Sequence, residues 1–146
     1  LKNIGLDLEG ETMVTIEVIA VVPGTEFNIF PHYDKYGELM PYAKGVTVAG
    51  TFAILSGVDG RDPETEVVID TRRRIAAGVA AGGPKEQMEI AWSKVKSWLQ
   101  EMGTSTENMV HECPLIAKRE DWPAAAQAQH AGGRIATAGA LLRNVG

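Results

Sequence analysis

Glu17 has the setting in this chain that most directly suggests chemistry. It is the one carboxylate in residues 13–22, MVTIEVIAVV, a segment rich in β-branched apolar side chains that we expect to form a strand. Apolar neighbours would remove solvent from the carboxylate, which suits a group that transfers protons. The alternative is a charge on a partly wetted strand face that discourages aggregation.

Several arginines lie outside the segments of regular apolar period, namely Arg61, Arg134, Arg143 and the run Arg72–Arg74. From the residues alone, each of them is interpreted as a solvated surface residue.

The three histidines, His32, His111 and His130, are too far apart in sequence for a metal-binding motif, and we predict no metal site. Strand alternation would place His111 and Cys113 on one side of a strand, with the intervening glutamate on the other. Cys113 is expected to be a small core residue and not a nucleophile.

The apolar periodicity predicts strands and two helices that would carry these residues. The expected elements are a strand at 13–22 ended by Pro23-Gly24, a loop at 24–41, a hairpin within 46–56, a long connection at 57–84 with a short strand at 66–69, a helix at 84–102, a strand at 109–117 weakened by Pro114, a helix at 122–131, and an apolar segment at 135–142 that fits either structure. In the first helix Trp92 belongs to the core stripe, and Trp98 is expected at an interface. This order supports an α+β or α/β sandwich with helices on one sheet face.

Length and charge set limits on function. The chain has 146 residues, the size of one domain, and 14 Lys and Arg against 19 Asp and Glu give a net charge of −5. This balance argues against binding to nucleic acid or to an anionic membrane. No apolar run approaches the roughly 18 residues of a membrane span. One cysteine permits no intrachain disulfide framework, which fits a cytoplasmic location.

Three segments together resemble the RidA/YjgF family, also called the reactive intermediate deaminase or L-PSP endoribonuclease-like family. They are Pro41-Tyr42-Ala43 with the following hairpin and Ile54-Leu55-Ser56-Gly57, the long helix over 87–103, and Thr15-Ile16-Glu17-Val18-Ile19-Ala20, which is similar to the family's terminal strand. The departure is in order, because the counterpart of the terminal strand pair, residues 3–22, comes first. We therefore expect either a circular permutation, which a fold tolerates when its termini lie close together, or a slice of a longer or tandem protein.

The resemblance implies an α+β fold of the RidA/chorismate-mutase-like type, with a mixed sheet packed against two helices. It implies a single domain over 1–146, assembled as a barrel-like homotrimer with clefts between subunits. The implied activity is hydrolytic deamination of a small imine, enamine or amino-substituted carboxylic acid, without a cofactor or metal. The alternatives are a catalytically silent binding or regulatory trimer and a specialised catabolic hydrolase or lyase.

The resemblance also assigns roles to residues. Glu17 would position the attacking water, Tyr42 would line the cleft, and Gly57 after Ser56 would let the backbone approach the ligand, although a plain turn glycine also fits. The family's catalytic arginine maps at or just before Leu1, where this chain has none. Arg143 is the first substitute, if the permutation closes the gap, with Arg134, Arg61 and the run Arg72–Arg74 as others.

Overall fold

The computed structural model describes residues 20–65, 67–68, 75–76, 82–116, 118–133, 138–139 and 142–143. The elements in these ranges are β1 (Phe27–Tyr33), β2 (Leu39–Val48), β3 (Phe52–Leu55), the 3-10 helix η1 (Pro63–Thr65), β4 (Val67–Val68), β5 (Ile75–Ala76), α1 (Pro84–Glu101), η2 (Thr106–Asn108), β6 (His111–Glu112), β7 (Leu115–Ile116), η3 (Arg119–Asp121), α2 (Trp122–Ala131), β8 (Ala138–Gly139) and β9 (Leu142–Arg143). Strands in both relative directions and two α-helices make this an α+β fold, as the sequence predicted.

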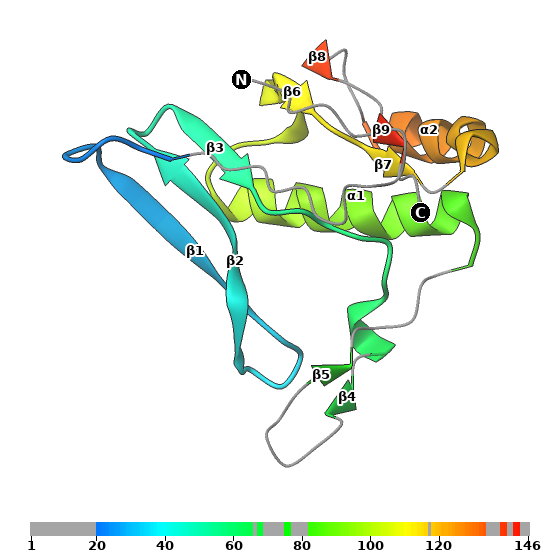
Figure 1. Cartoon of the computed structure of the whole chain (residues 1–146), viewed down its shortest axis with the longest axis horizontal. Coiled ribbons are helices and arrows are strands. Elements are labelled where there is room, and N and C mark those ends of the chain that lie inside the picture. Colours follow the sequence, from blue (N-terminus) through cyan, green and yellow to red (C-terminus); the bar gives the residue numbers. More distant parts are fainter. Residues whose placement is uncertain are drawn as a thin grey trace, which may run out of the picture.

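The largest sheet is antiparallel and has β2 between β1 and β3 (Figure 1). Its hairpin β2–β3 confirms the prediction for 46–56. The expectation of a loop over 24–41 is wrong, because β1 and the start of β2 occupy most of that range. Pro31 had suggested a loop, but β1 is an edge strand, where proline is tolerated beside irregular pairing. The register indeed shifts on both sides of Pro31.

The turn between β1 and β2 is built around the carboxylate of Asp34. Its Oδ1 accepts hydrogen bonds from the backbone N–H groups of Tyr36, at 2.8 Å, and Glu38, at 2.9 Å. Gly37 has a φ of +79°, a conformation that glycine adopts without steric cost. An aspartate that bonds the backbone two residues on is a standard way to start such a turn.

The predicted strand 13–22 is described only at its end. Residues 20–22 are not in a strand, and 13–19 lie outside the described residues. The expected stop at Pro23-Gly24 is a turn, in which the Thr25 N–H donates to the Val22 carbonyl at 3.2 Å.

Helix α1 confirms the clearest prediction of the sequence. Pro84 occupies its first turn, where a missing N–H costs nothing, and Gly103 follows its end with a φ of +79°. Trp92 and Leu99 are buried, as the stripe predicted. Trp98 is also buried, with 7% of its surface exposed, so its expected place at an interface is wrong.

One face of the sheet packs against α1. A Cβ atom on Gly45, in the middle of β2, would collide with the backbone carbonyl of Ile54 in β3 and would lie 2.5 Å from the Met102 side chain at the end of α1, so only glycine fits here. Directly paired residues share the opposite face, where Ile29 pairs with Val46 and Val46 with Ile54. Helix α1 therefore covers one face and leaves apolar side chains on the other.

Helix α2 packs along α1 (Figure 1). Small buried residues, Ala125 and Ala128, permit this approach, and the Trp92 indole Nε1–H donates to the Gly132 carbonyl at 2.8 Å. This bond fixes the end of α2 against the middle of α1.

The chain beyond α2 forms parallel ladders with the strands before it. β8 pairs with β6, and β9 pairs with β7. Parallel neighbours need a crossover, and α2 supplies it. The expected strand at 109–117 is divided into β6 and β7 at Cys113-Pro114, the point where Pro114 was expected to weaken it, and the apolar segment at 135–142 is strand where it is described. Within the described part of the chain, no helix has the length and apolar character needed to cross a bilayer.

Candidate functional site

Three of the predicted site residues, Tyr42, Ser56 and Gly57, lie where β3 ends beside β2. Because β2 and β3 run in opposite directions, the start of β2 and the end of β3 share an edge. The Ser56 N–H donates to the Lys44 carbonyl at 2.9 Å, just beyond the Gly45–Leu55 pair. This bond brings the stretch Tyr42–Lys44 next to Ser56 and Gly57.

Tyr42 belongs to an aromatic cluster that also contains His32 and Trp98. The His32 ring centroid is 4.9 Å from that of Tyr42 in a tilted arrangement, and 5.2 Å from that of Trp98 in an edge-to-face arrangement. Trp98 is buried, whereas 45% of the Tyr42 surface is exposed. The imidazole therefore lies between the core and a tyrosine at the surface.

His32 is a half-buried histidine with an unusual electrostatic setting. Its Nδ1 atom is buried and has no hydrogen-bond partner among the described residues. Loss of solvation, followed by the positive charges of Lys44 and Lys94, holds the pKa of His32 below its ordinary value of 6.5, against smaller opposite effects of Asp34 and Glu101. The ring is therefore neutral at physiological pH.

Sequence reasoning considered His32 only as a metal ligand and missed this position. Alternation in the segment FNIFPHY would have placed His32 on the same face as Phe30, opposite Ile29 and Tyr33. Pro31 and Pro41 favoured the interpretation of 24–41 as a loop, so the alternation of side chains around His32 was not used.

An ion pair joins the same end of the sheet to α1. Lys44 Nζ lies 2.7 Å from both carboxylate oxygens of Glu101. The pair is partly exposed, so it serves more to orient the two elements than to stabilise the fold.

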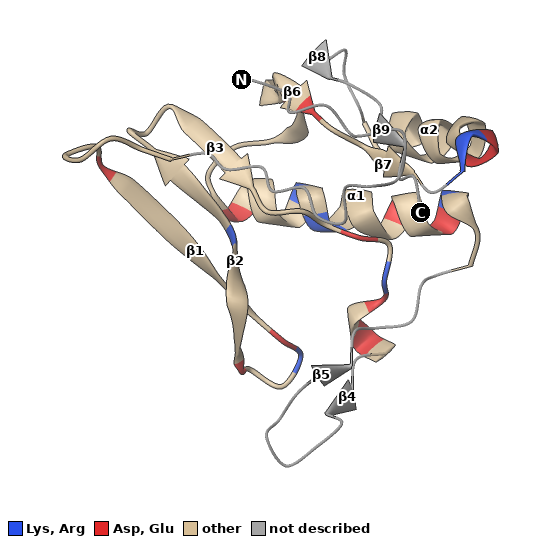
Figure 2. Ribbon diagram, viewed as in Figure 1, with Lys and Arg blue, Asp and Glu red and all other residues tan. Residues whose placement is uncertain are grey.

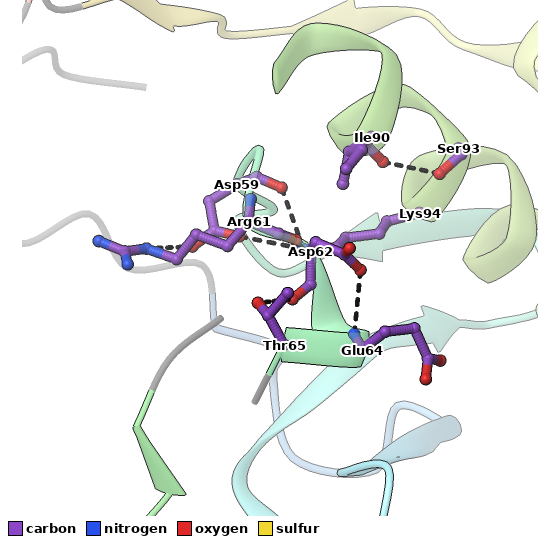
Figure 3. A network of polar contacts seen from close by, with 8 residues as sticks. All are labelled: Asp59, Arg61, Asp62, Glu64, Thr65, Ile90, Ser93 and Lys94. Carbon is purple, nitrogen blue, oxygen red and sulfur yellow. Dashed lines mark hydrogen bonds and ion pairs between the residues drawn. The ribbon is translucent and has the colours of Figure 1, made fainter. Parts of the chain in front are cut away.

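The loop that follows β3 is fixed to α1 by a lysine (Figure 3). Lys94 Nζ donates to the carbonyl of Asp59 at 3.1 Å, to its Oδ1 at 3.0 Å, and to the carbonyl of Arg61 at 2.8 Å. The predicted substrate-binding residue Arg61 is exposed, and its Nε lies 3.5 Å from Asp59 Oδ2. Asp59 is thus shared between two cations.

Gly57 has no local reason to be glycine. It is not among the glycines of positive φ, and a Cβ atom on it would meet nothing within 4 Å. The plain-turn explanation therefore has no support from the backbone conformation, and the role in ligand approach stays a prediction.

Charged residues are spread over the described surface (Figure 2). Basic positions occur on β2, on α1, in the loop after β3 and near the start of α2, with acidic positions among them. The basic residues in the described ranges are therefore distributed over several elements and interspersed with acidic ones.

The remaining predicted site residues cannot be joined to this cluster. Glu17, Arg134 and the run Arg72–Arg74 lie outside the described residues. Arg143 lies in β9, where its backbone pairs with Ile116, and its side chain is outside the description. Their roles stay predictions.

The strand β6 has the alternation that the sequence indicated, with exposed His111 and Cys113 and half-buried Glu112 between them. The expectation that Cys113 is a core residue is wrong. Glu112 Oε2 accepts a hydrogen bond from Gln129 Nε2 at 2.6 Å, which ties β6 to α2. Gln129 is almost fully buried.

A shallow cavity of about 250 Å³ lies between the two helices and contains none of the predicted site residues. Trp92 and Lys96 line it from α1, and Ala128 and Gly132 from α2 and its end. No group of three or more potential metal-ligating side chains is found within the described ranges.

Comparison with known proteins identifies the fold. A proposed endoribonuclease L-PSP from Entamoeba histolytica has a similar structure, with a TM-score of 0.63 and 18% identity over 82% of this chain and 87% of its own. A proposed endoribonuclease from Thermotoga maritima gives a TM-score of 0.60 and 19% identity over 80% and 84%. A RidA from an Antarctic Psychrobacter species gives 0.49 and 21% over 70% and 76%. No family model and no curated protein matches the sequence.

The chain therefore has the fold of the L-PSP endoribonuclease and RidA proteins. The resemblance seen in the sequence is confirmed at the level of the fold, including the mixed strands and the two helices. A fold by itself leaves the chemistry of the site open.

Proposed function

We propose that this protein is a RidA-like hydrolase that converts a small 2-imino or 2-enamino carboxylic acid into the 2-oxo acid and ammonia. The observation that carries the proposal is that Ser56 and Gly57, at the end of β3, lie beside the part of β2 that carries Tyr42, in a sheet with the L-PSP/RidA fold. In the sequence these positions matched the family's site pattern, and in the fold Ser56 is bonded to Lys44, two residues after Tyr42 on β2.

The reaction requires a positioned water and a grip on the substrate carboxylate. The Glu17 carboxylate orients water, which adds to the imine carbon, and the nitrogen takes up a proton. The carbon–nitrogen bond then breaks, ammonia leaves, and the carbinol oxygen becomes the carbonyl of the 2-oxo acid. Tyr42 and the backbone at Ser56–Gly57 hold the substrate. Arg143 or Arg61 binds its carboxylate.

The proposal includes a homotrimer. The outer face of the sheet carries exposed Phe27, Ile29 and Phe52, at 50%, 59% and 61% of their surfaces. A contiguous apolar face of this kind indicates an association surface. We propose that two further copies of this chain cover it, so that each site lies in a cleft between subunits.

We further propose that residues 1–146 form one domain and that the protein acts in the cytoplasm without a cofactor or metal. The single exposed cysteine, Cys113, is compatible with a reducing compartment.

The activity is tested with 2-iminopropanoate generated in situ by an amino-acid oxidase acting on alanine. The protein should accelerate the release of ammonia above the spontaneous rate. The variant Glu17→Gln should reduce that acceleration to background while the oligomer stays intact. Unchanged turnover in Glu17→Gln would remove this residue from the mechanism.

A second candidate is a silent binding protein, favoured by the contact of the Arg61 guanidinium with Asp59, which partly neutralises it. In that case pyruvate, the corresponding 2-oxo acid, should raise the melting temperature without any acceleration of ammonia release. Neither binding nor acceleration would reject both functions for 2-oxo acid chemistry.

A further inference from the structure

We infer that His32 is a positioning residue for Tyr42, and that as a neutral imidazole it holds the tyrosine ring in place at the edge of the substrate site. The role of Tyr42 in that site rests on the proposed function. The support of Tyr42 by His32 rests on the ring geometry alone.

Three aromatic rings connect the core to the candidate site. Trp98 on α1 is buried, and the His32 ring on β1 lies edge-to-face against it. The Tyr42 ring on β2 lies against His32 in a tilted arrangement. The contact with His32 restricts the half-exposed Tyr42 ring, and the contact with Trp98 restricts His32 in turn. The orientation of Tyr42 is therefore coupled to helix α1 through His32.

A histidine is not the residue that packing alone would favour at this place. Its Nδ1 is buried without a hydrogen-bond partner among the described residues, and such an unmet polar atom destabilises a fold. A phenylalanine would fill similar space without this penalty. Packing alone therefore gives no reason for a histidine at this position. The property that distinguishes an imidazole from a phenyl ring is that it titrates near neutral pH.

Burial and the surrounding charges set the direction of that titration. Loss of solvation is the largest effect, and it lowers the pKa of His32. Lys44 from β2 and Lys94 from α1 lower the pKa further, whereas Asp34 from the hairpin turn and Glu101 from α1 raise it by less. When His32 is protonated at acid pH, its charged ring is better solvated by water than in its buried place. The ring then moves toward solvent, and its contact with the Tyr42 ring is lost.

The test combines binding of pyruvate with the ring resonances of Tyr42, measured by NMR between pH 8 and pH 5 and assigned with Tyr42→Phe. In the wild type, the Tyr42 resonances should move with the same midpoint as the His32 Hε1 proton. His32→Ala should weaken pyruvate binding roughly three- to tenfold, the range expected for loss of one or two ring contacts. Its kcat for 2-iminopropanoate should change much less than its KM.

The variant His32→Phe keeps the ring and removes the titration. It should bind pyruvate as tightly as the wild type at pH 7.5 and lose the weakening at acid pH. His130→Gln is the matched control, because it removes an exposed histidine from the last turn of α2 and should behave like the wild type.

The outcomes separate the two proposals. If the Tyr42 resonances ignore the titration of His32, or if His32→Ala and His32→Phe both bind pyruvate like the wild type at every pH, His32 does not position Tyr42. If the wild type neither binds pyruvate nor accelerates ammonia release from 2-iminopropanoate, but the Tyr42 resonances follow His32, the positioning stands and the proposed function fails. Should His32→Ala not fold, His32→Phe and the resonances still decide the question.

Discussion

At the scale of single residues, His32 makes the stability of the fold depend on pH. The unfolded chain binds a proton at this histidine with the ordinary pKa of 6.5, and the folded chain binds it only at lower pH. As pH falls below 6.5, the unfolded state therefore takes up more protons, and the free energy of unfolding decreases. Well above pH 6.5 His32 is neutral in both states, and the stability of the fold no longer depends on its titration.

We predict from this that the urea midpoint of the wild type falls between pH 7.5 and pH 5 by more than that of His32→Phe. At pH 7.5 the variant should be about 1 kcal/mol more stable, because it removes an unmet buried nitrogen. If the urea midpoints of the two proteins change equally with pH, the pH dependence of stability does not come from His32.

Two glycines, Gly45 in β2 and Gly57 after β3, give a second prediction at this scale. Gly57→Ala should leave the free energy of unfolding within about 0.5 kcal/mol, since its φ and its surroundings accept a methyl group. The same variant should weaken pyruvate binding, because the added methyl group blocks the approach of the ligand to this backbone. Gly45→Ala should lose about 1–3 kcal/mol, because its Cβ would collide with the Ile54 backbone carbonyl as well as the Met102 side chain. Urea titration and calorimetry measure the two effects.

At the scale of elements, the site depends on a loop that one helix holds. Residues 57–62 follow β3 without regular structure, and Lys94 on α1 bonds two of their carbonyls. A loop with few buried contacts opens at low cost unless such bonds fix it. The geometry of Gly57 and Arg61 therefore depends on α1.

Lys94→Met should release this loop. We expect hydrogen exchange in a peptide covering 57–62 to accelerate severalfold, with unchanged protection in α2, because the three bonds to the ammonium are lost. Lys85→Met is the control on the same helix, since Lys85 is exposed and, among the residues that the structure describes, its ion pair is with Glu89, at 3.9 Å. Equal exchange in both variants would show that Lys94 does not hold the loop.

At the scale of the whole molecule, the sheet has one covered and one bare face. α1 covers the face that carries Gly45, while Ile29 and its neighbours remain exposed on the other. Burial of such side chains is the main source of favourable free energy in association, about 25 cal/mol for each Å² of apolar surface. A chain with this face open is expected to assemble.

The assembly is tested by Ile29→Glu, which places a charge in the centre of the bare face. Sedimentation velocity of the wild type should give three times the 15.7 kDa chain mass, and the variant should sediment as a monomer. Val110→Glu, an exposed apolar position outside the sheet, should remain a trimer. A monomeric wild type would remove the shared cleft from the proposed function.

Local signals in the sequence determined the two helices and one hairpin. The 3.6-residue apolar period of 84–102, the prolines that open both helices and the glycines that end them are properties of a few turns of chain, so they can be read without the fold. The same holds for the β2–β3 hairpin and for the break at Pro114. The family resemblance followed from the same segments.

Only the tertiary structure decided what depends on distant partners. An edge position made Pro31 acceptable in β1, and the close approach of α1 made Gly45 necessary, although neither neighbour is near in sequence. Trp98 is a core residue because His32 of β1 packs against it, and Cys113 is exposed. Sequence patterns report which side chains share a face, whereas the burial and the charge around a side chain are set by the elements that pack on that face.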